Sequence, residues 1–174
     1  MYVKDIMNQP VITCASDCTL NVAARLMWEH DCGTIPVVDH EGRLAGIITD
    51  RDICMAAYTQ GLPIQAIPIT SAMTQYALAC HLDDSVNTAE ELMREGQIRR
   101  VPVIDNEGRP VGIVAVSDLT RFAANAKETN FDRGVVSTLA AISTPRPGTI
   151  GANGAVVDRR ANLSSVPRPD ASRR

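Results

Sequence analysis

Two similar heptapeptides contain the residues of this chain that are best suited to bind a small molecule. GIITDRD ends at Asp52 and GIVAVSD ends at Asp118, and the threonine three residues before the first aspartate, Thr49, is replaced by Ala115 in the second. Threonine and aspartate at this spacing can form a capping box at a helix N-terminus. A strand that turns into a helix N-terminus is also a ready anion site. The pattern therefore indicates a helix cap, a ligand site, or both.

The second heptapeptide favours a ligand role for the aspartate. Ala115 has no hydroxyl, so Asp118 lacks the capping partner that Thr49 offers to Asp52. A cap alone would explain the first copy but not the aspartate of the second, even if Ser117 moved the cap to a later position. We therefore predict that both aspartates have a role beyond capping, and that the threonine has a separate role which the second copy does not share.

The heptapeptides are parts of a longer internal repeat with an offset of 66 residues. Residues 7–57 align with residues 73–123 without a gap, and 19 of the 51 pairs are identical. Each copy predicts the element order β-α-β-β-α. In the first copy the expected strands are 11–13, 35–38 and 44–48, with one amphipathic helix from Leu20 and a second from residue 50 or 51. The turn between the last two strands begins with Asp and ends with Gly, as turns favour.

The predicted fold is α+β, with two repeats packed together by approximate twofold symmetry. One repeat has too few residues to cover both faces of its sheet, so the two copies should pack against each other. The cleft between them is the natural ligand site. The expected parts are a first domain at 1–62, a second domain at 63–127, a C-terminal helix at 128–142 and a flexible basic tail at 143–174.

The two copies, IPVVD-HEG-RLAGIITDRD and VPVID-NEG-RPVGIVAVSD, resemble the tandem CBS (cystathionine beta-synthase) domain family, whose paired repeats form the Bateman module. The resemblance covers about residues 1–125. It implies that the cleft binds an adenosyl regulatory ligand, namely AMP, ADP, ATP, NAD or S-adenosylmethionine. It also implies that the chain regulates a partner protein by changing conformation or surface when the ligand binds.

In the first site, the resemblance assigns the ribose hydroxyls to Asp52 and the phosphate to Thr49. A carboxylate suits two vicinal hydroxyls because it only accepts hydrogen bonds. Arg51 is a candidate second phosphate contact. Pro36 has no N–H, which is consistent with an open strand edge beside the base. The residues assigned to the adenine are Ile35, the backbone before Pro36, Ile12 and Thr13.

In the second site, Asp118 takes the ribose role. Ala115 cannot donate a hydrogen bond to a phosphate, so this site departs from the family pattern. It must use Ser117, or Arg99 and Arg100, or else bind more weakly. The residues assigned to the base are Val101, Pro102, Leu78 and Ala79.

Charge and composition exclude several classes of protein. Six arginines and two aspartates give residues 143–174 a charge of about +4, so a total of −3 leaves about −7 on residues 1–142. An acidic body is a poor match for nucleic acid. No apolar run has the length of a membrane helix, and the N-terminal residues are too polar for a signal peptide. We therefore expect a cytoplasmic protein that neither binds nucleic acid nor spans a membrane.

No catalytic or metal-binding motif is recognised. The sequence contains neither a P-loop nor a zinc-protease helix, and its five cysteines include no Cys-x-x-Cys pair. The chain is expected to be a homodimer without catalytic activity of its own. Two alternatives stay open: a dimerisation scaffold with vestigial pockets, and a thiol-based redox protein. The redox alternative requires a lowered thiol pKa at Cys14 or Cys80.

Overall fold

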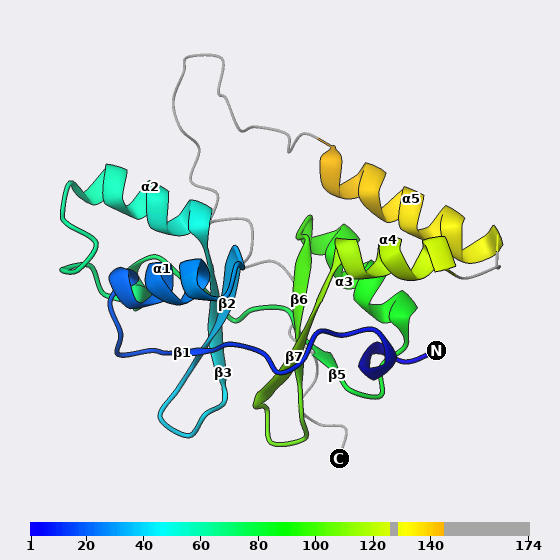
Figure 1. Ribbon diagram of the computed structural model, residues 1–174, viewed down its shortest axis with the longest axis horizontal. Helices are drawn as coiled ribbons and strands as arrows, with labels where there is room; N and C mark the ends of the chain where they lie inside the picture. The colour runs from blue at the N-terminus through cyan, green and yellow to red at the C-terminus, as the bar shows by residue number, and fades with distance from the viewer. Residues whose placement is uncertain (126–128, 145–174) are drawn as a thin grey trace. The chain divides into compact units, whose positions relative to one another are not determined.

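The computed structural model describes residues 1–125 and 129–144. Each repeat has the predicted β-α-β-β-α order (Figure 1). The first repeat consists of β1 (Cys14–Ala15), α1 (Leu20–Glu29), β2 (Thr34–Val38), β3 (Leu44–Thr49) and α2 (Asp50–Gln60). The second repeat consists of β5 (Cys80–His81), α3 (Val86–Gly96), β6 (Arg100–Ile104), β7 (Pro110–Ala115) and α4 (Val116–Asn125).

The first strand of each repeat lies later than the sequence predicts. Residues 11–13 were expected to form it, but β1 begins at Cys14, which pairs in parallel with Val37 of β2. Cys80 pairs with Val103 in the same way. The residues before each strand are only half-buried. Ile12 packs against the core of the first repeat, but residues 11–13 and 77–79 do not join the ladder.

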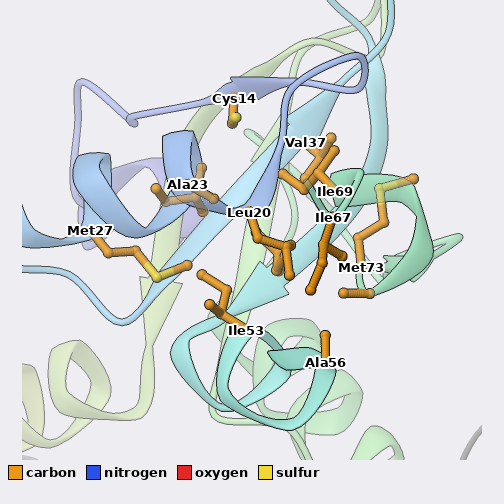
Figure 2. Close-up of a cluster of buried hydrophobic side chains, with 13 residues drawn as sticks. Cys14, Leu20, Ala23, Met27, Val37, Ile53, Ala56, Ile67, Ile69 and Met73 are labelled. Atoms are coloured by element: carbon orange, nitrogen blue, oxygen red, sulfur yellow. The ribbon is translucent and has the colours of Figure 1, made fainter. Parts of the chain in front are cut away.

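The sheets and helices bury one apolar core in each repeat. In β2, Ile35 and Val37 alternate with Thr34 and Pro36, and both apolar side chains are fully buried in the core of the first repeat. Figure 2 shows this core, in which side chains of α1, α2 and residues 67–73 meet those of the sheet. The second repeat has the matching core, built on Val101, Val103, Val114, Met93 and Leu119.

The two repeats exchange their leading segments. Val3, in the 3₁₀ helix η1 (Val3–Asp5), is buried in the core of the second repeat, and Asn8 pairs with Ile113 of β7. The equivalent segment contains η2 (Ile69–Ser71) and β4 (Thr74–Gln75), and Thr74 pairs with Ile47 of β3 in the first repeat. Each core therefore contains residues from beyond the boundary at 62 and 63, and that boundary stays a prediction.

The C-terminal helix α5 (Thr129–Ser143) packs on α3 and α4 and ends one residue later than expected (Figure 1). Val135 is buried in the core of the second repeat, whereas the neighbouring Val136 is 65% exposed. Glu90 of α3 is buried, and burial raises the pKa of its carboxyl. The predicted flexible tail lies, from residue 145 onward, outside the described residues.

Candidate functional site

The first heptapeptide forms the junction between β3 and α2, and Thr49 is the N-cap of the helix. Thr49 Oγ1 accepts a hydrogen bond from the Asp52 N–H at 3.2 Å. Asp52 Oδ2 accepts from the Thr49 N–H at 2.9 Å and from its hydroxyl at 2.7 Å. The capping box is therefore confirmed. The other carboxylate oxygen, Oδ1, has no hydrogen bond to any described residue, so Asp52 keeps acceptor capacity for a ligand.

The second heptapeptide keeps half of this cap. The Ala115 N–H donates to Asp118 Oδ2 at 2.8 Å, which matches the bond from Thr49 to Asp52. The sequence argument that a cap cannot explain Asp118 is therefore wrong, because this bond uses a backbone N–H that any residue except proline provides. Helix α4 begins at Val116, so the cap has not moved to Ser117, whose side chain is exposed.

Asp118 has further partners that Asp52 lacks. Asn8 Nδ2 donates to Asp118 Oδ2 at 2.7 Å, and Arg121 forms a short hydrogen-bonded ion pair with Oδ1. The Asp118 side chain is only 3% exposed. Sequence reasoning missed both partners, although the spacing of Arg121, three residues along a helix from Asp118, could have indicated the ion pair.

Arg100 extends from the second repeat to the first. Its Nη1 donates to Thr34 Oγ1 at 3.2 Å, and the Thr34 hydroxyl donates in turn to the Gly33 carbonyl at 2.7 Å. Thr34 is the cross-strand partner of Thr49. The prediction assigns Arg100 to the second site, but the structure places its guanidinium beside the strand end that leads to the first.

Arg99 and Arg51 each lie beside the start of a helix, and their predicted contacts with a ligand stay predictions. The Arg99 carbonyl accepts from the Val116 N–H at 3.0 Å, so this residue adjoins the start of α4. Arg51 is exposed in the first turn of α2. Among the described residues, no ion pair involves Arg51, Arg99 or Arg100. Their charges are thus available to an anion.

The residues assigned to the base have different degrees of burial. Ile35 and Val101 are fully buried in the two cores, so their main chain alone can face a ligand. Their burial follows from strand alternation, because the side chains of Ile35 and Val101 point to the opposite face of the sheet from those of Pro36 and Pro102. Both prolines are buried as well, and the remaining four residues are half-buried in the segments before β1 and β5: Ile12, Thr13, Leu78 and Ala79.

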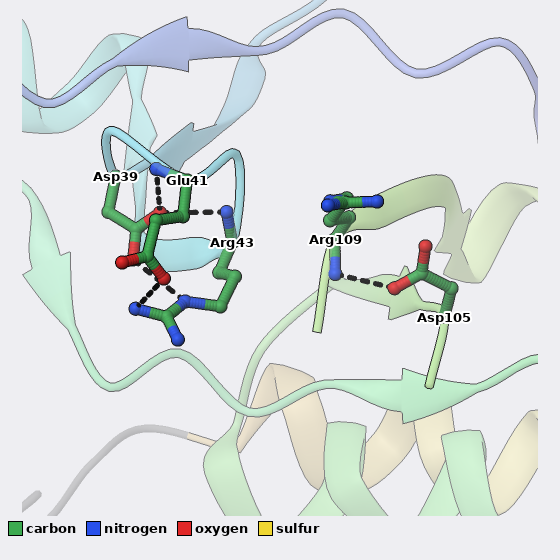
Figure 3. Close-up of polar contacts among 5 residues, drawn as sticks. All are labelled: Asp39, Glu41, Arg43, Asp105 and Arg109. Atoms are coloured by element: carbon green, nitrogen blue, oxygen red, sulfur yellow. Dashed lines mark hydrogen bonds and ion pairs between the residues drawn. The ribbon is translucent and has the colours of Figure 1, made fainter. Parts of the chain in front are cut away.

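The two β-hairpins join the repeats at the base of the sheets. The Leu44 N–H donates to the Gly108 carbonyl at 2.9 Å. Asp39 and Asp105 hold the two turns in the same way, each accepting from the backbone N–H of the arginine four residues later, as Figure 3 shows. That bond from Arg43 lowers the pKa of Asp39. The hairpin contact supports the predicted twofold relation, because equivalent turns meet.

A hollow of about 440 Å³ lies between α1 and α2 of the first repeat. Trp28 is on its rim and is 86% exposed, so this side chain is not core packing. The equivalent surface of the second repeat is covered by α5, where the Gln97 side chain donates to the Ala141 carbonyl at 3.4 Å. The hollow is lined by Met27, Trp28, Asp31, Cys32, Gly33 and Asp50, and a neighbouring hollow adds Ala24 and Ile53.

Cys14 and Cys80 do not have the lowered thiol pKa that the redox alternative requires. Burial raises the pKa of both Cys14 and Cys80 to about 12, whereas the redox alternative requires a lowered value. Within residues 1–125 and 129–144, no group of three or more His, Cys, Asp or Glu side chains could hold a metal ion. In the same part of the chain, every helix is too short or too polar to cross a membrane.

Comparison with known proteins shows which protein family the sequence matches. The family model described as "CBS domain" matches residues 3–58 and again residues 69–125. The chain is 40% identical over 117 residues to the CBS domain-containing protein YhcV of Bacillus subtilis, covering 67% of this chain and 81% of that protein. It is 35% identical to L-aspartate semialdehyde sulfurtransferase of Methanocaldococcus jannaschii over 72% of this chain, but it spans only 24% of that enzyme.

A solved structure has the same fold. It is the CBS domain pair of protein MJ0100 in complex with 5′-methylthioadenosine and S-adenosyl-L-methionine. Its TM-score is 0.65 at 34% sequence identity, and the match covers 72% of this chain and 97% of that one. The match confirms the α+β arrangement of two tandem repeats.

Proposed function

The chain belongs to the CBS domain family, and from this premise we propose that it is a regulatory protein which binds an adenosine-containing ligand between its repeats, at the first site. The proposal assigns the ribose hydroxyls to Asp52, whose Oδ1 accepts no hydrogen bond from any described residue and which lies in the first turn of α2. Thr49 and the N-terminus of α2 face the 5′ substituent. The solved relative with adenosyl ligands supports this class of ligand.

The contact from Arg100 to Thr34 carries the proposal. Through this contact a guanidinium of the second repeat lies next to Thr34 of β2. The residue opposite Thr34 on β3 is Thr49, which caps α2. An arginine that has no carboxylate partner among the described residues favours an anion. A 5′-phosphate is therefore the substituent that this site fits best, and AMP is the simplest such ligand.

Replacing Arg100 by methionine should weaken AMP binding and leave adenosine binding nearly unchanged. Hydrogen bonds to charged groups are worth about 1.5 to 3 kcal/mol, which corresponds to a tenfold or greater rise in the dissociation constant for AMP. Isothermal titration calorimetry with AMP and adenosine measures both values. Arg25→Met is the matched control, because Arg25 is exposed on α1 and, within the part of the chain that the structure describes, forms an ion pair with Glu29 alone. An equal loss for both ligands would contradict a phosphate role.

The regulatory part of the proposal follows from the position of the site. A ligand that contacts Asp52 of one repeat and Arg100 of the other stabilises the arrangement of the repeats in which both contacts form. The free energy of this stabilisation equals the difference between the ligand's affinities for that arrangement and for an alternative one. We infer that this arrangement changes the surface offered to a partner protein in the cytoplasm. The chain itself is proposed to have no catalytic activity. Its match to L-aspartate semialdehyde sulfurtransferase covers only 24% of that enzyme.

Self-association is a second candidate function, and the exposed Trp28 favours it. The surface of the second repeat that corresponds to the hollow is covered by α5, whereas that of the first repeat is open. We propose that two chains pair through α1 and α2 to form a homodimer. A large aromatic side chain on such a face is typical of a binding hot spot.

Trp28→Arg should therefore weaken the homodimer at least tenfold, because it puts a charge in place of the indole at the centre of the contact. Arginine is the residue at the equivalent position of the second repeat, Arg94, so the exchange is compatible with the helix. Sedimentation velocity across a concentration series measures the dissociation constant. A wild-type chain that stays monomeric, or an unchanged constant in the variant, would contradict this interface.

A further inference from the structure

The two aspartates lie at equivalent positions but have different neighbours. Each accepts the backbone N–H of its N-cap residue through Oδ2, at 2.9 Å for Asp52 and 2.8 Å for Asp118. Arg121 follows Asp118 by three residues, whereas the same position after Asp52 is occupied by Met55. The carboxylate of the first site thus has no cation at the place where that of the second site has a guanidinium.

The segment exchange adds a second difference. Asn8 pairs with β7 as Thr74 pairs with β3, so the two residues occupy equivalent places next to the two sites. The Asn8 amide reaches Asp118 at 2.7 Å. No hydrogen bond joins Thr74 to Asp52 among the described residues.

From these differences we propose that Arg121 and Asn8 close the second adenosine site, so that the chain takes one ligand, at Asp52. This inference rests on the proposed function and concerns how many sites are open. Both oxygens of Asp118 accept hydrogen bonds from the protein, and the side chain is 3% exposed. Arg121 is a cation and compensates the negative charge of the Asp118 carboxylate. The hydroxyls of a ribose are neutral and would not compensate it.

The closure explains how the second site tolerates Ala115. A site that receives no ligand needs no hydroxyl for a phosphate, so the threonine of the first copy has no function to keep at this position. Asp118 retains a structural role, because its carboxylate holds the start of α4, the N-terminal segment and Arg121 together.

The test compares ligand stoichiometry in the wild type and in a chain whose second site carries the residues of the first. The double variant Asn8→Thr, Arg121→Met introduces the side chains found at Thr74 and Met55. Calorimetry with AMP and with 5′-methylthioadenosine gives the number of sites, and the uncharged ligand removes any dependence on a phosphate contact. We expect one site in the wild type, two in the double variant, and one in the control Arg25→Met.

The reverse change tests the same idea in the first site. Met55→Arg places a guanidinium three residues after Asp52 and should weaken ligand binding there at least tenfold. Urea unfolding of each variant shows whether it is folded during the titration.

The possible outcomes distinguish failure of the proposed closure from failure of the proposed adenosine function. Two sites in the wild type would overturn the closure and leave the adenosine function intact. A folded double variant that still binds one ligand would also overturn the closure. A wild-type chain that binds neither ligand, when purified free of nucleotide, would overturn both.

Discussion

Replacing Asp52 by alanine is expected to remove most of the thermal stabilisation that AMP gives the wild-type protein. The Asp52 carboxylate is the acceptor proposed for the two ribose hydroxyls, and alanine leaves both without a partner. A ligand present at 100 times its dissociation constant stabilises the folded state by about 2.7 kcal/mol, so the effect is large. A thermal-shift titration with AMP measures it.

The control for this prediction is Asp50→Ala. Asp50 carries the same charge in the same helical turn, is exposed, and bonds the adjacent Arg51 N–H. Each variant is compared with its own ligand-free melting temperature, because Asp52→Ala also removes the capping bonds to Thr49. A full AMP shift in Asp52→Ala would rule out the ribose role.

Gly46→Ala is expected to lower the free energy of unfolding by about 3 kcal/mol, near the upper end of the usual range for overpacking. A Cβ atom at Gly46 would lie 2.6 Å from the Thr74 carbonyl oxygen. That carbonyl belongs to β4, which pairs with β3, so it cannot retreat without disrupting the exchanged segment. Urea denaturation of the wild type and the variant measures the difference.

The equivalent substitution in the second repeat provides a matched comparison. At Gly112 the added Cβ would meet the Met7 sulfur at 2.5 Å, and the nearest main-chain atom is the Asn8 oxygen at 3.2 Å. A methionine side chain can move to another rotamer. Gly112→Ala should therefore cost about 1 kcal/mol. Similar losses at the two glycines would show that contact with the exchanged main chain is not what limits the first.

The element order, the fold class and the cap at Thr49 could be predicted from the sequence because each depends on residues close together in the chain. Apolar periodicity defines helices and strands, and a capping box spans only four residues. Strand alternation would also have placed the Ile35 side chain in the core, had it been applied to β2. The duplication supported the predicted element order, since the same pattern occurs twice at one offset.

The partners of the charged groups were decided by the tertiary structure. Asn8 meets Asp118 across 110 positions of chain, and Arg100 meets Thr34 across 66, because the repeats exchange segments and face each other about an approximate twofold axis. Local patterns carry no information about which distant group will neutralise a charge or fill an acceptor. The sequence alone thus determined that two aspartates begin two helices and that Arg121 lies one turn after the second of them. Only the packing of the repeats brought Asn8 to Asp118 and Arg100 to Thr34.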